Sequence, residues 1–295
     1  MKNMKLKKSF GTQKKKRLSR SIGGDIFVFG VLFCFAMVMA LPLIYSIGNS
    51  LKPYGELFKF PPSFWVENPT LDNFTQMGEV LSTSWVPFSR YVANSVFITV
   101  VGVVLQIIFA TCAAYALTKF DFPGKGLLFS MVVYALMFSS VVTSIPTYLI
   151  MTKLNMIDTY WAIILPAAQS SMGLYLMRQF MSQLLPDSLL EAARIDGASE
   201  LQIIFKIAMP VVKPAWMTLA ILAIQSLWNA TGGNYIYSEE LKTLPVALNQ
   251  IVASGVARTG VGAAVSVCMM AVPIGTFLIS QNQVMETMAT SGMKD

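Results

Sequence analysis

Apolar residues gather along this chain into six runs, each long enough to cross about 30 Å of hydrocarbon as a helix. Lipid offers no hydrogen bonds to a peptide backbone, so runs of this kind are expected to be helical. The predicted spans are residues 26–51, 91–118, 126–151, 160–180, 207–230 and 261–281. The pattern therefore predicts an all-α integral membrane protein, with six transmembrane helices forming a single domain over residues 26–295.

Composition agrees with this prediction and excludes several kinds of chemistry. Of 295 residues, 55% are hydrophobic and 13% are charged, whereas soluble domains carry about 25% charged residues. The chain has no histidine, which removes most catalytic triads and imidazole metal sites. Cys34, Cys112 and Cys268 lie far apart in apolar runs, and no GxxxxGK[ST] phosphate loop occurs. We therefore expect no catalytic residue, no metal site and no cofactor in this chain.

Residues 1–25 form a basic tail. Residues 1–20 contain many lysines and arginines but no acidic residue, and they account for most of the net charge of +7. The positive-inside rule keeps such a tail in the cytoplasm, where it can contact anionic lipid. We expect no nucleic-acid binding. Six spans then place both termini in the cytoplasm of a multi-pass plasma-membrane (inner-membrane) protein, with the loop of residues 186–206 inside.

That inner loop begins the one long segment of the second half that mixes charged and apolar residues, PDSLLEAARIDGASELQIIFKIAMPVVKP at 186–214. Ser188 with Glu191, and less strongly Ser199 with Gln202, have the spacing of a capping box, which predicts two short helices. Gly197 suits the left-handed turn that ends the first of them.

The first predicted helix has one face that contains small residues. Leu189, Ala192, Ala193 and Asp196 share this face at helical spacing, and the two alanines allow close contact with a partner backbone. A capped amphipathic helix in an ordinary polar loop explains the same pattern equally well.

Polar side chains within or next to the spans are candidates for a substrate pathway, while no span has an acid or base near its centre. A carrier driven by protons or sodium usually needs such groups, so we expect an external energy source and an uncharged, hydroxyl-rich substrate such as a sugar. Hydrogen bonding between helices is the alternative role for each residue. The candidates are Ser140, Thr143, Gln169, Ser170, Gln225, Asn229 and Asn234.

The loop sequence EAARIDGASELQIIFKIAMPVVKPA resembles the EAA loop of binding-protein-dependent ABC importer permeases. Its signature is Glu-Ala-Ala, a Gly six residues after the Glu, and an apolar-Pro step further on. Other segments resemble the maltose-type carbohydrate permease family, in particular its smaller six-span subunit. They are NPTLDNF at 68–74, YALTKFDFPGKG at 115–126, TYWAIILP at 159–166, LWN at 227–229 and TLPVAL at 243–248.

The resemblance implies that residues 186–206 form a cytoplasmic two-helix coupling loop between spans 4 and 5. It also implies a homologous second permease subunit, cytoplasmic ATP-binding cassette subunits that bind ATP and Mg, and an extracellular or periplasmic solute-binding protein that delivers a sugar. The residues that would contact the ATPase subunit are Glu191, Ala192, Ala193, Arg194, Asp196 and Gly197.

Two segments depart from the family pattern. After LWN the sequence reads ATGGNYIYSEE, and the chain ends in QVMETMATSGMKD. The first departure lies where the pathway is expected to open, so the identity of the substrate does not follow from the resemblance. A self-sufficient secondary carrier or channel, and a membrane scaffold without transport, are the alternative functions.

Overall fold

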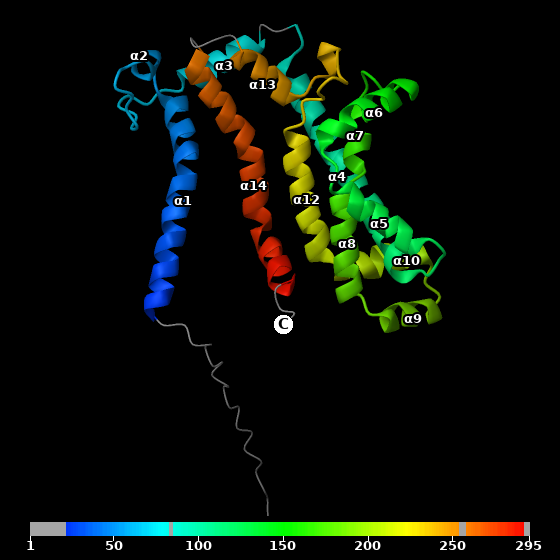
Figure 1. The fold of residues 1–295 in the computed structure, drawn as a ribbon. Helices are drawn as coiled ribbons and strands as arrows, with labels where there is room; N and C mark the ends of the chain where they lie inside the picture. The colour runs from blue at the N-terminus through cyan, green and yellow to red at the C-terminus, as the bar shows by residue number, and fades with distance from the viewer. Residues whose placement is uncertain (1–21, 83–84, 254–257, 292–295) are drawn as a thin grey trace, which may run out of the picture. The chain divides into compact units, whose positions relative to one another are not determined.

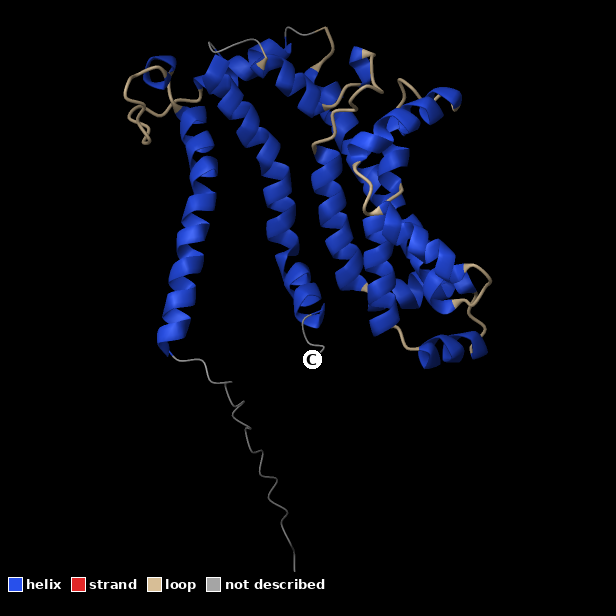
Figure 2. Ribbon diagram, viewed as in Figure 1, coloured by secondary structure: helices blue, strands red, loops and turns tan. Residues whose placement is uncertain are grey.

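The computed structural model describes residues 22–82, 85–253 and 258–291. Throughout these ranges the regular elements are helices, joined by loops and turns, and no strand occurs (Figure 2). The prediction of an all-α fold is confirmed. The chain separates into two compact units, residues 1–45 and 46–295. The predicted basic tail lies outside the described residues up to residue 21, and its boundary at residue 25 stays a prediction.

The described part of the first unit is one apolar helix, the portion of α1 (Ile22–Leu51) that precedes residue 46. Its side chains are exposed along almost the whole length, with Phe27, Phe29 and Met39 each about 72% exposed. An apolar helix without a polar face suits lipid rather than water.

Three helices of the described chain are long and apolar enough to cross a membrane, and they match three of the predicted spans (Figure 1). They are α1, α4 (Phe88–Lys119) and the first 23 residues of α14 (Thr259–Ser291). Their lengths agree with the predicted ranges 26–51, 91–118 and 261–281 to within a few residues.

The two apolar runs at 126–151 and 160–180 are each broken, which corrects the expectation of continuous helices. The first run contains α5 (Lys125–Ala135) and α6 (Ser140–Lys153), and the second contains α7 (Trp161–Ala168) and α8 (Ser171–Leu184). A serine precedes the second helix of each pair and caps it. The Ser139 hydroxyl accepts from the Val141 N–H at 3.3 Å, and the Ser170 hydroxyl from the Gly173 N–H at 2.9 Å.

The fifth run is bent rather than straight. The helical segment that contains it begins before residue 207, with α10 (Glu200–Ile203), the π-turn η1 (Ile204–Ala208) and α11 (Met209–Val211). It continues as α12 (Lys213–Trp228) after a bend of 85°. Proline has no N–H and fixes its φ angle, and Pro214 in the first turn of α12 explains why the hydrogen-bond ladder restarts there. If the bent pair is counted as one span, the described chain has four candidate spans.

Helix α4 is the centre of the second unit. It packs against α7, α8 and α12, and α12 in turn packs against α14. Gly102, near the middle of α4, allows a close approach to α12, because a Cβ atom there would lie 2.7 Å from a methyl group of Leu227. Small residues permit such close packing of membrane helices.

The described part of the connection between α1 and α4 contains α2 (Tyr54–Leu57) and α3 (Asp72–Ser82). The buried Asn73 amide donates to the carbonyl oxygens of Ser50 and Lys52 at 2.9 and 2.8 Å. The Glu56 carboxylate accepts from the backbone N–H of Glu67 at 2.9 Å. These bonds satisfy backbone groups that no helix or sheet would satisfy.

Candidate functional site

The predicted coupling loop folds as two short helices, α9 (Asp187–Ile195) and α10, separated at Gly197. Gly197 has φ of +82°, the left-handed conformation that glycine adopts most readily. Its N–H donates to the Arg194 carbonyl, and the Ala198 N–H donates to the Ala193 carbonyl, both at 3.0 Å. This is the Schellman arrangement, and it confirms the predicted left-handed turn at Gly197 that ends the first helix.

Of the two predicted capping boxes, only the second is present. The Ser199 hydroxyl accepts from the Gln202 N–H at 3.4 Å, and the Gln202 side chain accepts from the Ser199 N–H at 3.0 Å. The capping box predicted at Ser188 and Glu191 is wrong. The residue that precedes α9 is Pro186 rather than Ser188, so the helix begins two residues earlier than predicted and Ser188 lies inside its first turn.

The six residues expected to contact an ATPase subunit do not all face outward. Ala193 is 7% exposed and packs in the chain's own core beside Leu190. The other five are exposed, and so are two apolar side chains nearby, Ile195 at 86% and Leu201 at 65%. Ala193 therefore supports the fold from within, whereas the surface available to a partner includes Ala192 and Ile195. The five exposed residues are Glu191, Ala192, Arg194, Asp196 and Gly197.

Glu200 joins both helices of the coupling loop to α4. One oxygen of its carboxylate lies 2.8 Å from Nε of Arg194 on α9, and the other accepts from the Tyr115 hydroxyl on α4 at 2.7 Å. The Tyr115 ring is buried, with 1% exposed. The angle between α9 and α10 is thus fixed against the last turns of α4.

A second bridge connects the end of α4 to the start of α9. Nζ of Lys119 donates to the Asp187 carboxylate at 2.7 Å and also to the Leu185 carbonyl. The hydrogen bond and the positive charge of Lys119 hold the pKa of Asp187 below its ordinary value of 3.8. The contacts of Tyr115 and Lys119 with the coupling loop were not predicted from the sequence. Their partners lie 66 to 85 positions further along the chain, so no local spacing indicates them.

At the other end, the first turns of α4 hold the loop of residues 229–243, which contains the short helix η2 (Glu239–Leu241). The amide of Asn94, 3% exposed, donates to the carbonyl oxygens of Glu240 and Lys242 at 2.8 Å each. Its own oxygen accepts from the Tyr160 hydroxyl at 2.8 Å. At 1.5 Å per residue, the 32 residues of α4 separate the two ends by about 48 Å.

Asp158 also holds the 229–243 loop in place through hydrogen bonds. Its carboxylate accepts from the N–H groups of Tyr237 and Ser238 at 2.9 Å each, and from the Ser238 hydroxyl. Its own N–H donates to the Tyr235 carbonyl at 2.8 Å. The hydrogen bonds from Ser238, and then that from Tyr237, keep the pKa of Asp158 below its ordinary value.

Two of the predicted pathway residues, Gln169 and Ser170, lie together at the break between α7 and α8. They help to line a cavity of about 260 Å3 between α4, α5 and α8, together with Phe109 and Leu174. Ser170 also caps α8. Sequence analysis placed both residues in the middle of a continuous helix.

The remaining candidates do not converge on this cavity. Thr143 is exposed on α6, where Ser140 is the first residue. Asn229 ends α12 and donates to the backbone carbonyl of Gln225, one turn earlier, at 2.8 Å. Asn234 lies in the 229–243 loop and lines a different cavity. The seven candidates therefore lie in several separate regions of the structure and do not form one site.

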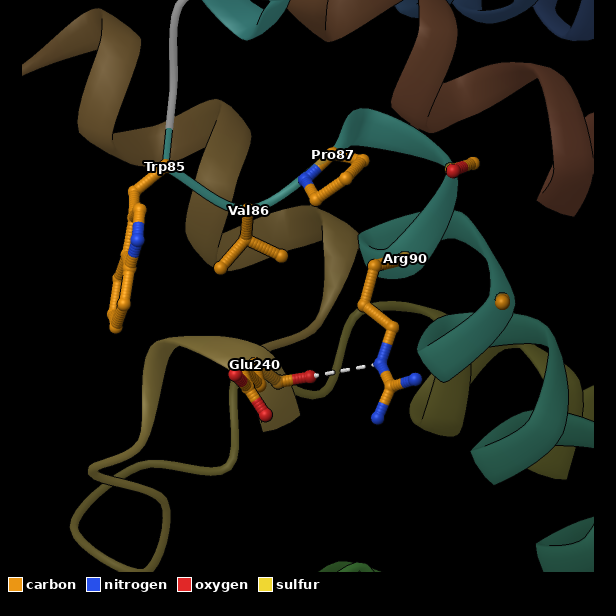
Figure 3. Close-up of a pocket in the computed structure, with 7 residues that line it drawn as sticks. Trp85, Val86, Pro87, Arg90 and Glu240 are labelled. Carbon is orange, nitrogen blue, oxygen red and sulfur yellow. Dashed lines mark hydrogen bonds between the residues drawn. The ribbon is translucent and has the colours of Figure 1, made fainter.

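Two cavities lie on the 229–243 loop. One, of about 530 Å3, is lined by residues of α6 and of the loop, among them Tyr148 and Asn234. The other, of about 580 Å3, is lined by the first turn of α4 and by Glu240 (Figure 3). There Nε of Arg90 lies 3.4 Å from the Glu240 carbonyl oxygen, and Trp85 is 87% exposed. None of the residues that line the second cavity is a candidate site residue in the sequence-based prediction.

Comparisons with known proteins agree over most of the chain. A family model described as "Binding-protein-dependent transport system inner membrane component" matches residues 11–286. Protein LplC of Bacillus subtilis (strain 168) is 38% identical over 197 residues. The match covers 65% of this chain and 62% of LplC, so this chain spans less than two thirds of the length of LplC.

Two further matches cover a larger share of the matched protein. The arabinooligosaccharides transport system permease protein AraQ of Halalkalibacterium halodurans is 34% identical over 245 residues, covering 79% of this chain and 83% of AraQ. A chain in the crystal structure of a bacterial ABC transporter involved in the import of the acidic polysaccharide alginate superposes with a TM-score of 0.76. It is 28% identical, over 90% of this chain and 99% of that one.

Proposed function

This chain belongs to the family of binding-protein-dependent transport system inner membrane components, and we propose that it is the permease subunit of an ATP-driven importer of oligosaccharides. It is a multi-pass protein of the inner membrane and a non-catalytic subunit. It transmits the motion of partner ATPase subunits, which bind ATP and Mg, to a pathway that it lines with a second, homologous permease subunit. A solute-binding protein delivers the sugar.

Two of the relatives whose names give a substrate differ in the charge of that substrate. AraQ is named for arabinooligosaccharides, which are neutral, and the solved transporter imports alginate, an acidic polysaccharide. What they share is a chain of linked sugar rings, and this is the substrate class that we assign to the present protein.

The observation that carries the proposal is the fastening of the α9–α10 pair to α4. Tyr115 and Lys119, in the last two turns of α4, hold Glu200 and Asp187 of the coupling loop. The exposed side of the loop, with Ala192 and its neighbours, stays available to an ATPase subunit. A displacement of the coupling loop by an ATPase subunit would therefore be transmitted to α4 through these contacts.

The same arrangement supports an orientation. The coupling loop faces the cytoplasm, where the ATPase subunits are, and the 229–243 loop at the opposite end of α4 faces the solute-binding protein. Both termini are then cytoplasmic. The exposed apolar surface of α1 contacts lipid or the second permease subunit.

The breaks in the helices support a pathway through the second unit. Transporter sites commonly form where spans are interrupted and backbone groups become available. Gln169 and Ser170 occupy such a break beside a cavity. A switch from 1:99 to 99:1 between inward-open and outward-open states needs about 5.5 kcal/mol of differential binding, which ATP binding to the partner subunits supplies.

The experiment uses the complete complex in liposomes, with its solute-binding protein and ATP. Gly197→Asp places a side chain where φ is +82°, so we expect sugar uptake to be lost while the chain stays in the membrane and the complex assembles. Gly55→Asp, at an exposed site with no neighbouring atom within 4 Å among the described residues, is the control. Full uptake by Gly197→Asp contradicts the proposal. Uptake by the chain without ATPase subunits favours the secondary-carrier alternative.

A further inference from the structure

The cavity between α6 and the 229–243 loop is lined by three tyrosines, and we call it the tyrosine pocket. The Tyr148 ring on α6 stacks on Tyr235 of the loop, with ring centres 6.1 Å apart and planes inclined by 23°. The Tyr148 hydroxyl lies 3.3 Å from the Tyr237 hydroxyl. The other lining residues are Ser144, Ile145, Leu149, Gly233 and Asn234.

The loop side of the pocket is held in place before any ligand arrives. Asp158 binds the backbone on both sides of Ile236, through the Tyr235 carbonyl and the Tyr237 N–H. Ile236 itself is 7% exposed and packs into the core beneath. A pocket whose walls are already fixed loses little entropy on binding.

The chemistry of the lining suits a neutral, hydroxyl-rich ligand. Phenol, hydroxyl and amide groups both donate and accept hydrogen bonds, and aromatic rings offer flat apolar faces for the C–H side of a sugar ring. The hydrogen bond with Tyr148 raises the pKa of Tyr237 above its ordinary value. None of the described lining residues is charged, in contrast to the cavity that contains Arg90 and Glu240. The volume of about 530 Å3 lies within the usual range for small-molecule sites.

We propose that the tyrosine pocket is a contact site for a neutral oligosaccharide at the mouth of the transport pathway. The proposal rests on the proposed function, because a sugar must reach this end of the chain. The loop wall comes from ATGGNYIYSEE, the segment that we expect from the sequence to depart from the family pattern.

The test measures uptake by the complete complex in liposomes at several concentrations of sugar-loaded solute-binding protein. The probes are arabinotriose, which is neutral, and an alginate trisaccharide, which is acidic. Wild type is expected to import arabinotriose in preference. Tyr148→Phe and Tyr237→Phe keep the rings but remove a hydroxyl, and each should raise KM about threefold to tenfold. Tyr235→Ala should raise it at least as much, with unchanged ATP hydrolysis in the absence of sugar.

The matched control is Tyr54→Phe, an exposed tyrosine outside the pocket, for which KM should equal that of wild type. Wild type that imports arabinotriose, with all three pocket variants at wild-type KM, overturns the inference and leaves the proposed function standing. Preference for the alginate trisaccharide overturns the assignment of a neutral ligand. A wild-type complex that imports neither probe contradicts the proposed function itself. Variants that fail to assemble with the second permease subunit show that the pocket is a subunit contact, which also overturns the inference.

Discussion

Lys119, the last residue of α4, and Asp187, the first residue of α9, form an ion pair with a nitrogen–oxygen distance of 2.7 Å. The pair is asymmetric, because the Lys119 side chain is 8% exposed and that of Asp187 is 79% exposed. Because the Asp187 carboxylate is open to solvent, the pair contributes little to overall stability. Its role is local, since it fixes where the coupling loop leaves the body of the protein.

The pH dependence of this contact follows from the lowered pKa of Asp187. A carboxylate with a lowered pKa in the folded state stabilises the contact above its ordinary pKa and loses this effect as the pH falls through the lowered value. We expect a spin label at Ser188 to have low mobility at neutral pH and higher mobility as the pH falls below 3.8.

Asp187→Asn should show the higher mobility at neutral pH and little change with acid. Asp121→Asn is the matched control, because Asp121 pairs with Lys125 at 3.0 Å without contacting α9. A label that titrates identically in wild type and Asp187→Asn would refute the role assigned to the ion pair.

Glu200 is expected to be more important for stability than Asp187. Glu200→Ala removes the partner of Arg194 and leaves the buried Tyr115 hydroxyl without its hydrogen bond, which costs about 1–3 kcal/mol. The melting temperature of the purified complex should fall, together with ATP hydrolysis stimulated by the loaded solute-binding protein. Glu67→Ala, which breaks an exposed pair with Lys59 at 3.2 Å, should change neither. Equal melting temperatures for the two variants would contradict the prediction.

Neighbouring alanines in the coupling loop should respond differently to the same change. Ala192→Leu enlarges an exposed site, so the chain should fold normally and assemble poorly with ATPase subunits. Ala193→Leu forces extra methyl groups into a core where Ala193 is 7% exposed, and overpacking of this kind costs about 1–3 kcal/mol. The yield of folded protein should therefore fall only for Ala193→Leu. Size-exclusion chromatography of the chain alone and of the complex separates the two effects, and the reverse result would show that α9 is oriented differently.

Local signals in the sequence predicted the coupling loop well. The Ser199–Gln202 box and the turn at Gly197 depend on residues within a few positions of one another, and both are present. The capping box predicted at Ser188 is absent because Pro186, extended at φ −73° and ψ 144°, is the N-cap, and α9 therefore begins two residues before the predicted start. The bridge from Tyr115 to Glu200 spans 85 positions, so no local pattern indicates it.

The breaks in the apolar runs were missed for a different reason. Hydrophobicity continues through the breaks before α6 and α8, so a pattern based on composition predicts one span where there are two helices. Ser139 and Ser170 cap these helices, and a serine at such a position can indicate the start of a helix. A serine within an apolar run can equally indicate a residue of the substrate pathway. Placement of Asn234 in a pocket with Tyr148 depends on tertiary packing that spacing along the chain does not reveal.

Close packing at Gly102 gives a further prediction. Gly102→Val directs methyl groups toward Leu227, which is itself 3% exposed, and should push α4 and α12 apart at a cost of about 1–3 kcal/mol. Transport and melting temperature should both decrease. Gly275→Val, at a glycine of α14 with no atom of the described residues within 4 Å of an added Cβ, is the control and should behave as wild type. Normal transport by Gly102→Val would mean that the two helices need not stay in contact there.

The position of Gly102, close to the midpoint of the 32 residues of α4, has a mechanical consequence. A stiff rod that tilts about its middle moves its two ends in opposite directions. Displacement of the end that carries Lys119 in one sense therefore shifts the end that carries Asn94 in the other. If α4 pivots there during transport, opening on one side of the bilayer and closing on the opposite side would be a single movement of this helix.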